Sequence, residues 1–430
     1  MPGQPAGAVD AFQPREQAGL AEQAAGARRE ALAFAASAAW ADTARIAVID
    51  PLSGPFANIG EYNVKHAQMA VDQINARGGV AGTQKIELVL LDSKNNPQEA
   101  GLVLQQAIDQ NVRYVYQAAG SVVGGALLEA VGKYNARNPD KAVLYLNHGA
   151  IEPSFTNERC NFWHFRFDSH QIMKIGAFTE AAARDRSVHK VYLINQDYSA
   201  GQVFARETRA MLARKRPDIE IVGDDLHPLG KVKDFSPYIA KIKASGADTV
   251  MTNNWGNDIA LLIKAAKDAG LNVSWYAMYV YLTGTPAMVG DPGGGSVKTL
   301  MSWHANIADN QLESYANAYK ARYKADWGWL PGYLALQMLA RAMDQAKSTD
   351  PAKVALALES MRYDGPTGQV WMRAEDHQLS QPLYLASFAK AGQPGVKYDV
   401  ENTGFGWRTE ARIEARDTVM PHACRMQRPE

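Results

Sequence analysis

Few side chains in this sequence fall into the patterns that proteins use to hold metals. No HExxH motif and no paired ligand spacing connects the histidines His148, His164, His170 and His304. The two cysteines, Cys160 and Cys424, lie in no C-x-x-C or metal-ligand spacing either. The sequence therefore predicts no metal site.

The groups that could break a bond are equally isolated. Ser53 and Ser121 lack the G-x-S-x-G turn that exposes the nucleophile of an α/β hydrolase. The acidic run Glu375-Asp376 is more typical of a turn than of the paired carboxyl groups of a glycosidase. The glycine-rich stretch 290–296 has no Gly-Lys-Ser/Thr, so it is no phosphate-binding loop. The sequence therefore shows no catalytic constellation, and we expect neither a catalytic residue nor a cofactor.

Composition excludes further classes. The 45 lysines and arginines balance the 45 aspartates and glutamates, and a nucleic-acid-binding protein usually carries a basic excess. No apolar run reaches the roughly 18 residues that a membrane-spanning helix requires. Nine tryptophans and eighteen tyrosines are enough to line a pocket. We expect neither a nucleic-acid partner nor a transmembrane helix.

Residues 1–41 are predicted to be a leader that directs export to the periplasm. Arg28 and Arg29 precede the mostly apolar segment 31–40, and Ala39-Trp40-Ala41 places small residues at both positions that determine cleavage. The alternative is a frayed Ala-rich helix. In an exported protein, Cys160 and Cys424 are expected to form a disulfide that ties the C-terminal tail to the first lobe. Without export, two reduced thiols are expected.

Predicted strands and helices alternate in two successive halves. The first half has strands at 44–50, 86–92, 114–116 and 143–146, with helices at 61–77, 97–110 and 121–136. The second half has strands at 190–194, 219–222, 249–252 and 275–278, with helices at 200–213, 238–244 and 258–269. This repetition predicts an α/β fold with two lobes, each built on a parallel sheet.

The C-terminal third returns to helices, at 311–325, 332–347 and 351–361, followed by strands at 369–372 and 382–388. Ligands of open α/β sheets bind beyond the carboxyl ends of the strands. The segments expected to form the site are 51–60, 117–122, 147–152, 195–199, 253–258 and 279–283.

Several stretches together resemble the leucine/isoleucine/valine-type periplasmic solute-binding proteins of ABC importers. They are Pro51–Pro55, Ala67–Val80, Gln196–Gly201, Ala269–Leu271 and Ala374–Leu379, in that order along the chain. The resemblance implies two Rossmann-like lobes with parallel sheets joined by three crossover strands, which is the type I periplasmic binding protein fold. It also implies domain boundaries: residues 42–167 plus 303–376 for lobe 1, 168–302 plus 377–410 for lobe 2, and 411–430 for the tail.

The resemblance also implies where a ligand carboxylate is held. The family uses a serine after the third strand of lobe 1, which matches Gly120-Ser121, and backbone groups after the fourth, which match Gly149-Ala150-Ile151. Ile151 stands in the position of a threonine. Ser121 is also expected near a helix N-terminus, whose free N–H groups favour an anion; a plain helix cap is the alternative.

The remaining matches describe the walls of the cleft. Tyr198 and Trp255 match aromatic residues of lobe 2, and Ile59 replaces one of lobe 1. The family's amino-acid binders carry a glutamate for the ligand ammonium where this chain has Tyr279. A buried ammonium without a carboxylate is costly. Asp258 is a candidate substitute, although it is more typical of the N-cap of its own helix.

With Tyr281 added, the predicted pocket has one end for an anion and an aromatic, uncharged remainder. Such a lining favours a flat acid of the benzoate or cinnamate type over a zwitterion. We expect the substrate-binding component of an ABC importer, a monomer whose partners are a small-molecule carboxylate or amino acid and a permease in the inner membrane. Two alternatives stay open: a branched-chain or other amino-acid binding protein of the same class, and a cytoplasmic ligand-sensing regulator of the same fold.

Overall fold

The computed structural model describes residues 43–291 and 296–429. The predicted leader, residues 1–41, lies outside the described residues. Among the helices that are described, none combines the length and the apolar character needed to cross a membrane.

The first sheet has five parallel strands in the order β2-β1-β3-β4-β5. The strands are β1 (Ala44–Asp50), β2 (Ile86–Asp92), β3 (Tyr114–Gln117), β4 (Leu144–Asn147) and β5 (His164–Arg166). Successive side chains of β1 point to opposite faces: Ile46 and Val48 join one apolar layer, and Ala47 and Ile49 join the other. Both faces are therefore buried, as is usual for parallel sheets.

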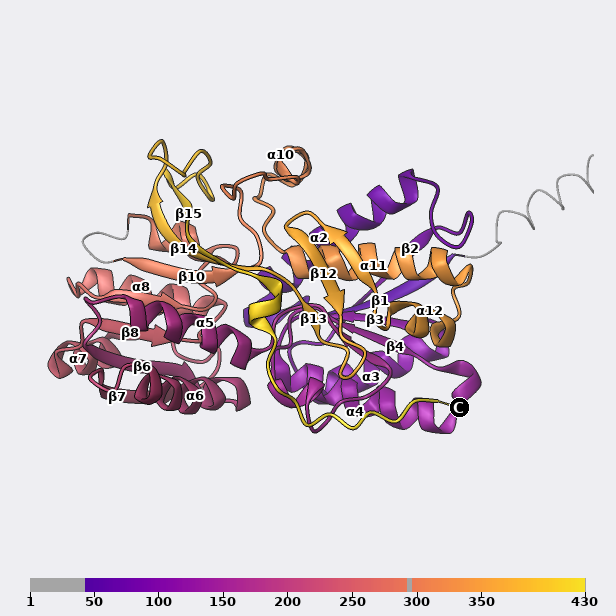
Figure 1. Cartoon of the computed structure of the whole chain (residues 1–430), viewed down its shortest axis with the longest axis horizontal. Helices are drawn as coiled ribbons and strands as arrows, with labels where there is room; N and C mark the ends of the chain where they lie inside the picture. Colours follow the sequence, from indigo (N-terminus) through magenta and orange to yellow (C-terminus); the bar gives the residue numbers. More distant parts are fainter. Residues whose placement is uncertain (1–42, 292–295, 430) are drawn as a thin grey trace, which may run out of the picture. The chain divides into compact units, whose positions relative to one another are not determined.

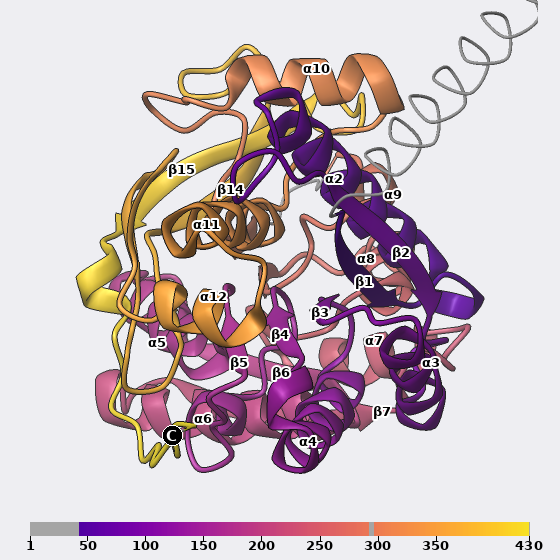
Figure 2. The ribbon, with the colours of Figure 1, turned by 90° about the vertical axis from the view of Figure 1, so that its right-hand side faces the viewer.

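Helices cover the two faces of this first sheet. They are α2 (Ala57–Ala76), α3 (Pro97–Asp109), α4 (Ser121–Arg137), α11 (Leu330–Ala346) and α12 (Pro351–Leu358). Figure 2 shows α2 and α11 on one side of the strands and α3 and α4 on the other. α11 belongs to this layer although strands of the second sheet precede and follow it in the sequence, and α10 (Glu313–Tyr323) packs Tyr319 into the same core.

The second sheet has seven strands in the order β15-β14-β10-β9-β8-β6-β7. They are β6 (Lys190–Gln196), β7 (Glu220–His227), β8 (Thr249–Thr252), β9 (Ser274–Ala277), β10 (Val297–Met301), β14 (Leu383–Lys390) and β15 (Phe405–Ile413). Its helices are α5 (Gln171–Arg184), α6 (Ser199–Lys215), α7 (Ser236–Ser245), α8 (Asn257–Asp268) and α9 (Thr285–Val289). The strands β6 to β10 pair in parallel, whereas β14 and β15 are antiparallel to their neighbours.

The chain passes between the two sheets after β5, after β10 and after a small antiparallel sheet (Figure 1). That small sheet consists of β11 (Arg362–Gly365), β12 (Gly368–Met372) and β13 (Leu379–Ser380). The side-chain amides of Gln378 and Gln381 donate hydrogen bonds to the carbonyl oxygens of Asp168 and Phe167, at 2.9 and 2.6 Å. Two of the passages are thus tied together. The predicted α/β fold with two sheet-based lobes and three crossovers is confirmed.

A fourth passage follows β15. The turn η4 (Ala415–Thr418) leads the C-terminal tail back to the first sheet, where Cys424 forms a disulfide with Cys160. Arg428 Nη2 lies 2.6 Å from Glu359 Oε1 in an ion pair. The tail therefore connects the far edge of the second sheet covalently to the first lobe.

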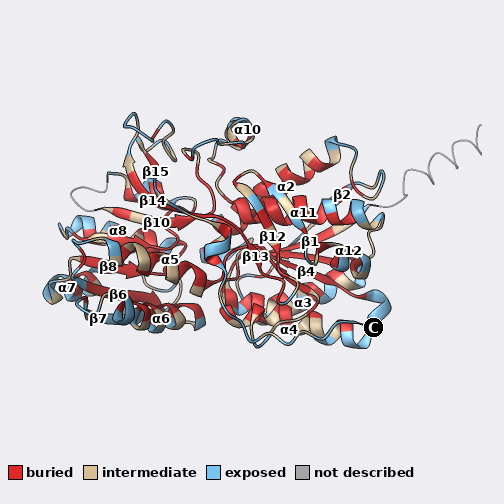
Figure 3. Ribbon diagram, in the orientation of Figure 1, coloured by how far each residue is buried: buried red, intermediate tan, exposed pale blue. Residues whose placement is uncertain are grey.

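The sequence pattern missed some elements. β10, β11 and β15 were not predicted, and α2 begins at Ala57, one turn before the predicted start. β15 gave no clear strand pattern because it lies at a sheet edge with Glu410 and Arg412 exposed, whereas the strands in the middle of each sheet are buried (Figure 3).

Candidate functional site

A small cavity of about 50 Å³ lies where loops that follow strands of both sheets meet. From the first sheet and its helices it is lined by Ile59, Asn63, Ala118, Ala119, Gly120, Ser121, Gly149, Ile151 and Trp329. From the second it is lined by Tyr198, Trp255, Tyr279 and Leu282. No charged side chain is among these described lining residues. Of the predicted ligand-binding residues, only Ala150, Asp258 and Tyr281 lie elsewhere.

The loop after β3 forms the polar end of this cavity. Gly120 is the N-cap of α4 and has a positive φ of 84°, which favours glycine. A Cβ atom there would lie 2.4 Å from Asn95 Oδ1. Ser121 is the first residue of the helix and is buried at the cavity wall. The first N–H groups of an α-helix have no partner within the helix, so this end presents a hydroxyl and N–H groups, which suit a carboxylate.

Asp50 orients this loop from behind the cavity. Its Oδ1 accepts hydrogen bonds from the N–H groups of Ala118 and Ala119, at 3.1 and 2.8 Å. Its Oδ2 accepts one from Asn63 Nδ2 at 2.9 Å. Burial raises the pKa of Asp50 to about 6, although these hydrogen bonds oppose the shift. All three partners line the cavity.

The loop after β4 differs from the prediction. Asn147 Oδ1 accepts hydrogen bonds from the N–H groups of Gly149 and Ala150, at 3.1 and 2.8 Å, and its Nδ2 donates to Ala150 O. The prediction that these two N–H groups are free for a ligand is wrong, because the Asn147 side chain already uses them. The Ala150 methyl group points toward Gly124. Gly149 and the buried Ile151 line the cavity.

Four aromatic rings form the remaining wall: Tyr198, Trp255, Tyr279 and Trp329. The Trp329 indole nitrogen donates a hydrogen bond to His148 Nδ1 at 2.8 Å. Burial, with a smaller effect of His66, holds the pKa of His148 well below its usual value, so its ring is neutral. Phe56, which precedes α2, stacks on Trp255 with ring centroids 4.3 Å apart. This stack joins the two lobes beside the cavity.

A buried ion pair lies behind Tyr279. Lys174 Nζ is 2.6 Å from Asp168 Oδ2, and the two side chains are 2% and 3% exposed. The same Nζ donates to the Tyr279 hydroxyl oxygen at 3.5 Å and lies 5.0 Å from the centre of its ring. Burial, then the charge of Asp168, holds the pKa of Tyr279 well above its usual value. The wall at this point is therefore a neutral phenol.

Asp258 lies outside the cavity. Its Oδ2 accepts hydrogen bonds from Gln196 Nε2 and from the N–H group of Gly230, both at 2.8 Å. The prediction that Asp258 caps its own helix is wrong, because α8 begins at Asn257 and its N-cap is Gly256. Asp258 is thus hydrogen-bonded within its own lobe, away from the cavity, and is no substitute for the missing glutamate.

Sequence reasoning missed five lining residues: Asn63, Ala118, Ala119, Leu282 and Trp329. Asn63 lies one helical turn after Ile59, so the spacing could have revealed it. Ala118, Ala119 and Leu282 fall within segments already expected to form the site. Trp329, just before α11, is the exception, because only the passage of the chain back to the first lobe brings it to the cleft.

A cavity between two α/β lobes joined by three crossovers defines a solute-binding protein of the type I fold. Residues 43–393 match the family model described as periplasmic binding protein, and the chain belongs to this family. It is 32% identical over 419 residues to the Leu/Ile/Val-binding protein homolog 4 of Brucella abortus (strain 2308), covering 94% of this chain and 98% of that protein. The resemblance seen in the sequence is thereby confirmed.

Solved structures agree with this assignment. The leucine-, isoleucine-, valine-, threonine- and alanine-binding protein from Brucella ovis, in its closed conformation, superposes with a TM-score of 0.80 at 29% identity and covers 90% of this chain and 100% of that chain. A solute-binding protein of an ABC transporter from Rhodopseudomonas palustris BisB5, in complex with 3,4-dihydroxybenzoic acid, has a TM-score of 0.74 at 19% identity and covers 87% and 98%. At that identity the likeness concerns the fold.

Proposed function

We propose that this protein is the substrate-binding component of an ABC importer and carries a small organic acid, with an aromatic carboxylate favoured. One observation carries this proposal: the cavity has a serine and a helix N-terminus at one end, four aromatic rings around the rest, and no charged side chain among its described lining residues. A carboxylate would accept hydrogen bonds from Ser121 and the first turn of α4. The rings would contact a flat apolar body.

An amino acid fits this cavity less well because of its ammonium group. The position at which the family's amino-acid binders carry a glutamate is Tyr279, and Lys174 lies directly behind it. Asp168 neutralises Lys174 and is therefore not available to a ligand. A ligand ammonium would lose its hydration without gaining a carboxylate partner.

The alternative is a branched-chain or other amino-acid binding protein of the same transporter class. The names of the Brucella relatives favour it: one is a homolog of Leu/Ile/Val-binding proteins, and the other is named as binding leucine, isoleucine, valine, threonine and alanine. The internal geometry of the cavity favours the acid. The two proposals differ in one chemical feature, the ligand's α-ammonium group.

Transport would require the lobes to close on the ligand and the closed protein to dock on a permease in the inner membrane. The Phe56–Trp255 stack is an interlobe contact suited to the closed state. We further propose a periplasmic monomer whose leader is residues 1–41. Its lobe 1 would comprise 42–167 plus 303–376, and its lobe 2 168–302 plus 377–410. Two strands depart from these bounds: β15 runs on to Ile413, and β13 pairs with β12 of lobe 1.

Matched ligand pairs test the proposal on protein that begins at residue 42. Leucine is compared with 4-methylpentanoate, and phenylalanine with 3-phenylpropionate, since each pair differs only in the α-ammonium group. Binding is followed by the thermal shift, because a ligand that binds only the folded state raises the melting temperature. We expect larger shifts from the acids that lack the ammonium. Larger shifts from both amino acids would contradict the proposal and support the alternative. Ser121→Ala should reduce the shift of every carboxylate.

A further inference from the structure

A second cavity, about 100 Å³ in volume, lies beside the cleft. Three pairs of neighbouring residues form the wall between the two cavities. In each pair, the earlier residue lines this larger cavity and the later residue lines the cleft cavity. These pairs are Tyr62 and Asn63, Tyr281 and Leu282, and Gly328 and Trp329. The second cavity is therefore a separate compartment, between α2, α10 and the loop that joins β14 to β15.

Aromatic rings form much of its surface. They are Tyr62, Tyr281, Trp303, Trp327, Tyr398 and Trp407, and all except Tyr398 are buried. Aromatic faces carry a negative partial charge and attract cations at close range. A lining of this kind suits a ligand with an apolar surface and a positive charge.

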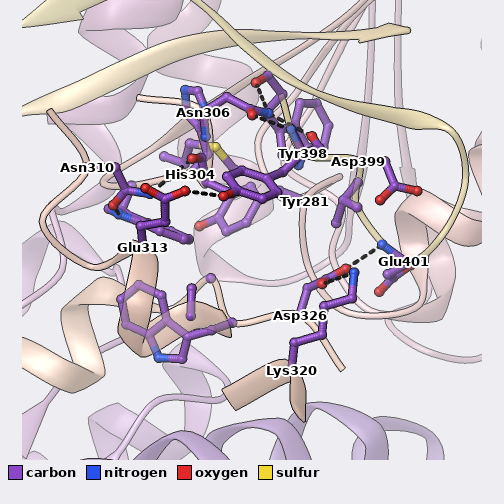
Figure 4. A pocket seen from close by; sticks show the side chains of 18 of the residues that line it. Tyr281, His304, Asn306, Asn310, Glu313, Lys320, Asp326, Tyr398, Asp399 and Glu401 are labelled. Carbon is purple, nitrogen blue, oxygen red and sulfur yellow. Dashed lines mark hydrogen bonds and ion pairs between the residues drawn. The ribbon is translucent and has the colours of Figure 1, made fainter. Parts of the chain in front are cut away.

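Carboxylates also line this cavity, and two of them form no ion pair with the part of the chain that the structure describes. Asp326 pairs with Lys320 at 2.9 Å, and Glu313 pairs with Lys397 at 2.6 Å. Among the described residues, no lysine, arginine or histidine forms an ion pair with Asp399 or Glu401. Figure 4 shows Glu313 on one side of the cavity and Asp399 and Glu401 on the other.

Backbone groups hold both of these unpaired carboxylates in place. Glu401 accepts hydrogen bonds from the N–H groups of Gly284 and Ala287, at 2.6 and 2.8 Å. Asp399 Oδ2 accepts one from Gly404 at 3.1 Å. Burial raises the pKa of Glu401 although these two hydrogen bonds oppose the shift, and the neighbouring charge of Asp326 adds a smaller increase. A positive charge in the cavity would relieve this unfavourable arrangement.

We propose that this compartment binds a small organic cation, an ammonium group with apolar substituents, independently of the ligand in the cleft. Among the described residues there is no group of three or more His, Cys, Asp or Glu side chains placed to hold a metal ion. The cation is therefore one that aromatic faces can surround, with Asp399 and Glu401 supplying the opposite charge.

Calorimetric titration with a matched probe pair tests this site. Choline and 3,3-dimethylbutan-1-ol have the same shape, and only choline carries a charge. We expect choline to bind at least about tenfold more tightly than the alcohol, and Asp399→Asn or Glu401→Gln to remove most of that difference. Asp364→Asn, an exposed residue of β11 that lines neither cavity, is the matched control and should change nothing.

Ser121→Ala separates this site from the cleft, because Ser121 lines only the cleft cavity. Choline binding should survive this substitution, whatever the cleft binds. The proposal is overturned if choline does not bind at millimolar concentration or binds no better than the alcohol. It is also overturned if both carboxylate variants, folded by their melting temperatures, keep full affinity, or if Ser121→Ala abolishes choline binding.

Discussion

Lys174 and Tyr279 are in direct contact behind the ligand cleft: the ammonium nitrogen lies 3.5 Å from the phenol oxygen. Because Lys174 donates to that oxygen, the phenolic hydrogen remains free for an acceptor in the cavity. Asp168, at 2.6 Å, balances the charge and belongs to the first crossover. This contact links a wall of the cleft to the segment that joins the lobes.

Removal of the buried cation alone should be strongly destabilising. Lys174→Met leaves Asp168 buried without a partner, and such changes cost about 3–5 kcal/mol of unfolding free energy. The double variant Asp168→Asn/Lys174→Met removes both charges and should be considerably more stable than the single one. Urea unfolding measures both. A double variant no more stable than Lys174→Met would show that the pairing has no such effect.

Tyr279→Glu should change the ligand preference. It restores a carboxylate where the ammonium of an amino acid would bind, and Lys174 is already paired with Asp168. We expect affinity for 3-phenylpropionate to fall at least about tenfold, and phenylalanine to become the better ligand of the two. Tyr279→Phe keeps the ring and serves as control. Unchanged preference in Tyr279→Glu would place the ligand's polar end elsewhere.

Asp50 should make stability depend on pH. Its pKa is raised from 3.8 to about 6 in the folded protein, so the proton binds more tightly there than in the unfolded chain. The resulting stabilisation is fully present below about pH 4 and is lost as the pH rises through 6. It corresponds to about 3 kcal/mol. Between pH 4 and pH 7 the unfolding free energy of the wild type should therefore fall by this amount relative to that of Asp50→Asn, which has no titrating group at this position. A constant difference between the two proteins would contradict the shift.

The disulfide should stabilise the protein without affecting the cleft. It closes a loop of 264 residues, and loop-closure entropy gives an upper value of about 5.6 kcal/mol. Cys160→Ser/Cys424→Ser should therefore unfold at clearly lower urea concentration and bind cleft ligands as before. Arg428→Ala removes a half-exposed ion pair of the same tail and one hydrogen bond to Ala374 O, and should change stability by less than about 1 kcal/mol. Equal losses in the two variants would show that the covalent link adds nothing.

Much of the fold could be predicted because most of its strands are short runs of apolar, β-branched residues that are recognisable in the sequence. Short β-branched runs such as Ala44–Asp50 and Thr249–Thr252 alternate with amphipathic helices, and both sheets follow from that alternation. The edge strand β15 (Phe405–Ile413) could not be predicted, because its alternating charges mark a solvated surface as readily as a strand. Its place in the second sheet depends on pairing with β14, which is a tertiary contact.

Site residues that directly follow a strand could be predicted from the sequence. Features that depend on hydrogen-bond partners or on the tertiary path of the chain could not. Ser121 and Tyr279 face the cavity because parallel strands direct their following loops to one edge. The free N–H groups expected at Gly149 and Ala150 depended on what Asn147 does, and its side chain binds both. Trp329 reaches the cleft only because the chain returns to the first lobe, and the local sequence around Trp329 does not indicate that return.

The central claim is that the cleft holds a carboxylate with an aromatic body and has no place for an ammonium group. Calorimetric titration of benzoate and leucine into protein beginning at residue 42 tests it most directly. The geometry of Ser121, Tyr279 and the uncharged lining predicts that benzoate binds at least about a hundredfold more tightly than leucine. Tight binding of leucine together with no detectable binding of benzoate would contradict this claim.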